Sequence, residues 1–168
     1  MTRARDVADS ALVHIKTETF SGVSTLSFND VFSADYENYL VIVDLKTGTS
    51  SAGLSFRVRV AGADLTTSTY RIANSRQDPS SFNFNVFGGN PTSSFSGPDS
   101  KAGNTIYARF GMPFLTQNTS FLVEGDGVSY RNVRGGGYVD NTTSYTGFTV
   151  YPSSGTITGT ALVYGYRK

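Results

Sequence analysis

The chain has 168 residues, which is enough for one domain of ordinary size with a substantial core. Charged residues make up 16% of it and the formal net charge is +1, which argues against a protein that binds nucleic acid by neutralising many phosphates. It has no cysteines, which excludes disulfides and thiolate metal sites.

The composition favours β-structure throughout. Gly, Ser and Asn suit turns, whereas Thr, Tyr and Phe suit a half-buried pleated surface, and strong helix formers are scarce. No segment approaches the roughly 18 apolar residues that a membrane helix needs, so we expect no membrane partner. The N-terminus lacks the apolar stretch of a signal peptide, so we expect synthesis in the cytoplasm without standard export.

Residues 1–11 differ from the rest of the chain. Their charges alternate in sign around small apolar residues, and a helix this short would be marginal in water without a surface to dock on. Two interpretations stay open for them, a docking arm and a frayed terminus. The predicted domain spans residues 12–168.

A period of two begins at Leu12 and predicts a series of strands. Residues 12–20 form the first, a turn is expected at Ser21-Gly22, and residues 23–28 form the second. Residues 39–45 are the most apolar stretch, which predicts a central strand.

The clearest alternation lies in residues 53–60. Arg57 and Arg59 alternate with apolar residues, so this strand should bury one face and present both arginines to water or to a partner. Residues 106–114 repeat the pattern, and Pro113 suggests an edge or a bulge at their end. The predicted apolar face of the strand at 53–60 consists of Leu54, Phe56, Val58 and Val60.

Later strands follow at intervals of roughly ten residues, as in a β-sandwich or jelly roll. About eight to ten strands are expected in all. Residues 75–81 and 88–103 are polar and predict loops, although Phe95 suggests that the second loop docks on something. The later strands are predicted at 82–87, 119–124, 145–151 and 160–166.

No pattern for catalysis is present. His14 is the only histidine, and it alternates with apolar neighbours in a predicted strand, which indicates a surface position. No carboxylate pair for glycoside hydrolysis can be chosen from the sequence. We therefore expect no enzyme activity, no metal and no cofactor. The carboxylates considered were Asp35, Glu37, Glu124, Asp126 and Asp140.

The chain has ten Tyr and twelve Phe but no Trp. Tyrosine and arginine favour protein interfaces, although the rings also suit a core with their hydroxyls at its rim. The triple glycine at 135–137, just before Tyr138, predicts a bulge or a close backbone approach. The candidate subunit interface consists of Arg57, Arg59, Tyr138, Tyr164 and Tyr166.

Residues 20–32, 36–42 and 155–167 resemble virion structural proteins of tailed bacteriophages, many from marine and cyanobacterial phages. Residues 3–9 resemble the N-terminal segments of some phage fibre and structural proteins. The resemblance implies an antiparallel, jelly-roll-like β-sandwich, a homotrimer, a place on the virion and no catalytic residues. Its implied partners are other copies of the chain and the phage major capsid protein or tail proteins.

Within this family a capsid decoration, or cement, protein is the leading expectation. It would bind the outer surface of the head and stabilise it. The alternative is a receptor- or carbohydrate-binding module of a tail fibre or tail tip, which would bind a host surface glycan through exposed aromatics and through loops 75–81 and 88–103. The expected capsid-docking residues of the arm are Arg3, Arg5, Asp6 and Val7.

Overall fold

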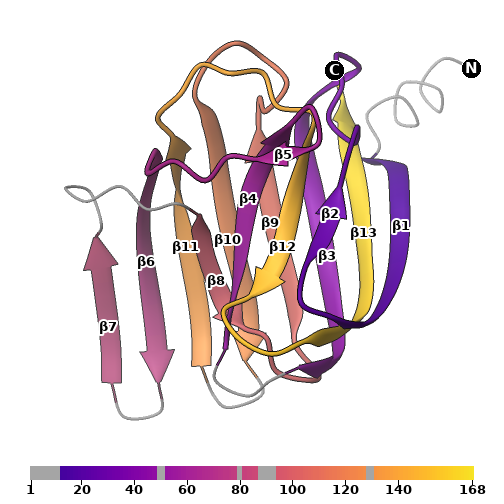
Figure 1. The fold of residues 1–168 in the computed structure, drawn as a ribbon. Helices are drawn as coiled ribbons and strands as arrows, with labels where there is room; N and C mark the ends of the chain where they lie inside the picture. The colour runs from indigo at the N-terminus through magenta and orange to yellow at the C-terminus, as the bar shows by residue number, and fades with distance from the viewer. Residues whose placement is uncertain (1–11, 49–51, 79–80, 87–93, 128–130) are drawn as a thin grey trace, which may run out of the picture.

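Figure 1 shows a computed structural model of the chain, which describes residues 12–48, 52–78, 81–86, 94–127 and 131–168. These residues form thirteen strands and no helix, so none of them forms a helix that could span a membrane. The strands make two antiparallel sheets that pack face to face. The predicted all-β sandwich is therefore confirmed, with more strands than expected.

The larger sheet has eight strands, which contain most of the strand residues. Their order across the sheet is β1 (Leu12–Val23), β13 (Ile157–Arg167), β3 (Tyr36–Gly48), β9 (Thr105–Gly111), β10 (Thr119–Gly127), β11 (Arg131–Val139), β6 (Tyr70–Asp78) and β7 (Ser81–Val86).

The smaller sheet lies over the middle of one face of the larger one, and β7 extends beyond it (Figure 1). Its order is β2 (Leu26–Phe28), β12 (Gly147–Pro152), β4 (Gly53–Val60) and β5 (Ala63–Asp64), and β8 (Phe95–Asp99) pairs with β4.

One hydrophobic core lies between the sheets, and aromatic rings fill much of it. Phe28 stacks on Phe148 with ring centroids 4.7 Å apart, and Phe110 lies 5.5 Å from Phe148. Each ring buried in this way contributes about 1.5–3 kcal/mol to folding. Leu54 and Phe56 of β4 are fully buried, as their alternation predicts.

The second face of the larger sheet has no further layer over it in the described part of the chain. We call it the open face. The strand pairing places on it the residues that alternate with the core positions. Its polar and aromatic members include Asn38, Tyr107, Arg109, Ser120, Glu124, Arg134, Tyr138, Tyr164 and Tyr166.

Several local predictions were wrong. The turn expected at Ser21-Gly22 is a register shift within β1, between Phe20 and Val23. The strand expected to run to residue 114 ends at Gly111, because Met112 adopts a left-handed backbone with φ of 57°. Val60 is 36% exposed and does not belong to the buried face of β4.

The two predicted loops contain strands. Residues 75–78 continue β6, so the expected loop at 75–81 is wrong. Within the stretch 88–103, residues 95–99 form β8, and Phe95 is fully buried against Phe121. The indication that Phe95 docks is therefore confirmed, and the surface on which it docks is the chain's own core.

The triple glycine forms regular strand. β11 pairs with β10 and β6 without a register shift, so no bulge lies there. A Cβ on Gly137 would lie 1.8 Å from the carbonyl oxygen of Arg71, so the close backbone approach occurs within this sheet. The proposed docking arm at 1–11, with Arg3, Arg5, Asp6 and Val7, lies outside the described residues.

Candidate functional site

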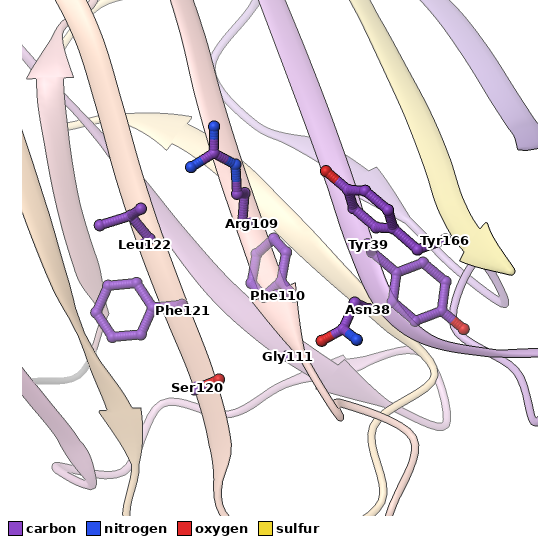
Figure 2. A pocket seen from close by; sticks show the side chains of 9 residues that line it. All are labelled: Asn38, Tyr39, Arg109, Phe110, Gly111, Ser120, Phe121, Leu122 and Tyr166. Atoms are coloured by element: carbon purple, nitrogen blue, oxygen red, sulfur yellow. The ribbon is translucent and has the colours of Figure 1, made fainter. Parts of the chain in front are cut away.

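A hollow of about 430 Å³ lies on the larger sheet where β13, β3, β9 and β10 run side by side (Figure 2). Its open-face residues come from four strands, of which only β9 and β10 follow one another in the sequence. The residues that line it are Asn38, Tyr39, Arg109, Phe110, Gly111, Ser120, Phe121, Leu122 and Tyr166.

Gly111 lines the hollow between Asn38 and Ser120. It ends β9 and pairs with Asn38 on one side and Ser120 on the other. A Cβ at this position would lie 2.3 Å from Ser120 Oγ and 3.4 Å from Asn38 Oδ1. A larger side chain at residue 111 would therefore fill the floor of the hollow.

Side chains of different chemical types surround Gly111 in the hollow. Tyr166 comes from β13, where it pairs with Asn38 on the neighbouring strand. Arg109 comes from β9 and pairs directly with Leu122 of β10. A ligand in the hollow would meet an aromatic ring, a guanidinium, an amide and a hydroxyl within one small area (Figure 2).

Ion pairs orient the guanidinium of Arg109. Its Nη2 atom lies 3.0 Å from Glu124 Oε1, and the other carboxylate oxygen lies 3.7 Å from Arg134 Nε. The Arg109 side chain is 48% exposed, so these pairs contribute less than about 1 kcal/mol to stability. Their main consequence is that the Arg109 guanidinium is oriented toward Glu124.

Further tyrosines lie around the hollow on the same face. Tyr107 and Tyr138 are 39% and 41% exposed. Tyr164 contacts His14 edge to face with ring centroids 5.5 Å apart. His14 is exposed on β1, which confirms its predicted surface position.

The predicted interface residues lie on two different surfaces. Tyr138, Tyr164 and Tyr166 share the open face, whereas Arg57 and Arg59 lie on the outer face of the smaller sheet. The structure does not bring these two groups together. Whether either surface contacts another subunit stays a prediction.

Both arginines of β4 already have partners within the chain. Arg57 lies over the ring of Tyr151, with its Cζ atom 4.6 Å from the ring centroid. Arg59 pairs with Asp64 and donates to the hydroxyl of the buried Thr149 at 2.7 Å. Arg59 therefore joins β4 to β5 and β12.

Three polar residues of the hollow and one glycine were missed as site residues. The alternation of residues 106–114 places Arg109 on the side away from the core, which is a weak signal for it. Nothing in the local sequence marks Asn38, Gly111 or Ser120. They come together only because β3, β9 and β10 are adjacent in the sheet.

The side chains that line the hollow carry an amide, a hydroxyl, a guanidinium and phenol groups. No carboxylate or histidine is among the residues that line it. Of the carboxylates considered from the sequence, Glu37 pairs with Lys168, Glu124 with Arg109, and Asp140 with Arg71. The described residues contain no group of three or more potential metal ligands of the His, Cys, Asp and Glu type.

Comparison with known protein families found no match, and comparison with curated proteins found none either. The fold is similar to a galectin of Caenorhabditis elegans (9% identity, TM-score 0.38), over 88% of this chain and 94% of that chain. It is also similar to domain 4 of a Geobacillus stearothermophilus arabinanase in complex with arabinotriose (11%, 0.36), over 94% and 76%. A human SPRY domain (11%, 0.40) is similar over 92% and 97%. Identities and TM-scores this low say nothing about what this chain binds.

Proposed function

We propose that this chain is a carbohydrate-binding module that acts without catalysis, carried on the surface of a bacteriophage particle. The observation that supports binding is the hollow of the open face, which Tyr166, Arg109, Asn38 and Ser120 line together with Gly111 (Figure 2).

This combination suits a sugar ring for a physical reason. A pyranose has an apolar face of C–H groups and a rim of hydroxyls, so it needs a flat apolar surface beside directional donors and acceptors. Tyr166 supplies the flat surface. Arg109 supplies charged donors, and Asn38 and Ser120 supply both donors and acceptors.

The site is also shallow and open, which favours a modest affinity for each copy. Only a small part of a long glycan would be removed from water. Exposed side chains of the site would also lose conformational entropy on binding, which lowers the affinity. Display of many copies on one particle compensates, because linked sites bind a surface far more tightly than a single site does. A host polysaccharide with repeating units is the ligand that best suits such display.

The phage part of the proposal is supported by the resemblance of residues 20–32, 36–42 and 155–167 to virion proteins. Capsid decoration as a homotrimer stays the rival role, and its docking arm lies outside the described residues. Counting copies per purified particle separates the two roles. Hundreds of copies favour decoration, whereas a few to tens favour a fibre or tail tip.

Glycan binding is tested by applying the purified, labelled chain to an array of bacterial surface polysaccharides and their oligosaccharides. The matched variants are Tyr166→Ala in the hollow and Tyr151→Ala on the outer face of the smaller sheet. We expect selective binding that Tyr166→Ala reduces at least about tenfold, while Tyr151→Ala leaves it unchanged. Binding that both variants retain, or that both lose equally, would contradict the proposed site.

A further inference from the structure

The two edges of the larger sheet differ in how they are protected. β1 forms one edge, and two register shifts interrupt its pairing with β13. This strand also presents an ion pair between Lys16 and Glu18. Bulges and charges of this kind prevent an edge strand from pairing with another chain.

β7 forms the other edge and has none of these protections. Its pairing with β6 has no register shift, and residues 81–86 contain no charge, proline or glycine. Phe82 and Phe84 are 69% and 65% exposed, the two highest exposures among the large hydrophobic residues that the structure describes. A regular, uncharged edge strand with exposed apolar side chains favours pairing with a further strand.

We propose that β7 pairs antiparallel with the β7 strand of a second copy, so that the two larger sheets form one continuous sheet across a two-fold axis. The outer edge of β7 pairs with no described strand, so its outward backbone N–H and C=O groups can pair with an extended partner. Because residues 81–86 have no charge, two copies approach without repulsion. The phenylalanines of one strand would then lie beside apolar residues of the other.

The alternative partner within a second copy is the β1 edge, and the structure disfavours it. β1 would have to pair through its two register shifts and beside Lys16 and Glu18. A contact between β7 and β1 would also be heterologous, so it would add copies without limit or close a ring. The contact between two β7 strands is isologous and ends at a dimer, in contrast to the homotrimer expected from the resemblance.

The test is the molar mass of the full chain in sedimentation velocity across a wide range of concentrations. We expect a reversible dimer, and Phe82→Lys with Phe84→Lys should weaken it at least about tenfold. The matched control is Leu12→Lys on the β1 edge, where Leu12 is 43% exposed, and it should leave the dimer intact. Because all three side chains are exposed, circular dichroism should show the wild-type fold in each variant.

Hydrogen exchange distinguishes edge pairing from any other dimer contact. The backbone amides of residues 81–86 should exchange slowly in the dimer and faster in the Phe82→Lys, Phe84→Lys double variant. Three results would overturn the inference: a monomer at every concentration, an oligomer that the double variant leaves intact, or an oligomer that Leu12→Lys dissociates.

Discussion

The guanidinium of Arg109 and the carboxylate of Glu124 form an ion pair diagonally across two neighbouring strands, with 3.0 Å between Nη2 and Oε1. In the register, Arg109 pairs directly with Leu122 and Glu124 pairs directly with Tyr107. The diagonal contact directs the guanidinium along the sheet, beside the hollow. One residue is thus oriented by another that does not itself line the site.

We expect Glu124→Gln to weaken glycan binding about threefold to tenfold, because the Arg109 fork would lose its orienting partner. Arg109→Ala should weaken binding more, by at least about tenfold, since it removes the donors themselves. Calorimetric titration measures both affinities. The melting temperature should stay nearly constant in both variants, since exposed ion pairs contribute little to stability. Equal loss of affinity and stability would contradict a positioning role for Glu124.

Gly111→Val should abolish binding by filling the floor of the hollow. The backbone of Gly111 is outside the left-handed region, and its nearest obstacle is the rotatable hydroxyl of Ser120, so the variant should fold. Gly136→Val is the matched control, because Gly136 lies on the same face but does not line the hollow. A glycan that binds Gly111→Val as tightly as the wild type must bind somewhere else.

Arg59→Ala should destabilise the fold by about 2–4 kcal/mol, since it breaks a largely buried pair with Asp64. It also removes a donor to the fully buried Thr149. Arg57→Ala should cost less than Arg59→Ala, because the contact that it removes from the Tyr151 ring is worth about 0.5–1 kcal/mol at an exposed site. Urea unfolding measures both. If Arg59→Ala instead changed only the oligomeric state, the subunit-interface role predicted for Arg59 would be correct.

Three buried tyrosines should make the fold sensitive to alkaline pH. Desolvation raises the pKa of Tyr39, Tyr70 and Tyr145 above the ordinary value near 10. Their stabilising contribution is therefore complete below about pH 10 and is lost as pH rises toward their folded-state pKa values, because the unfolded chain loses those protons first. Unfolding free energies measured from neutral to strongly alkaline pH should fall only above about pH 10.

Tyr70→Phe tests this pH dependence at one group. The Tyr70 hydroxyl donates to the Leu65 carbonyl at 2.8 Å and accepts from the Val58 amide at 3.2 Å. We expect a loss of about 1–3 kcal/mol at neutral pH and a shallower decline above pH 10. A decline as steep as that of the wild type would mean that Tyr70 does not contribute to it.

Periodicity predicted the parts of the fold in which one face alone is buried. Residues 53–60 are an example, since burial of Leu54, Phe56 and Val58 follows directly from their alternation. Residues 75–78 and 95–99 were missed as strands, because polar residues or glycine and proline occupy them and tertiary pairing decides their conformation.

The hollow was less predictable than the fold. The alternation of residues 164–166 correctly placed Tyr164 and Tyr166 on one face. It gave no information about which residues of other strands would lie beside them. Gly111 and Ser120 pair across two consecutive strands. Asn38 and Tyr166 join them only through the positions of β3 and β13 in the sheet, a long-range relationship that no single segment contains.

A titration of the isotopically labelled chain with its glycan, followed by backbone amide resonances, tests the carbohydrate site most directly. We expect the largest shifts at Arg109, Gly111 and Ser120, with little change at Arg57 and Tyr151 on the other outer face. Shifts centred on β4 and β12, or no shifts with any host polysaccharide, would contradict it.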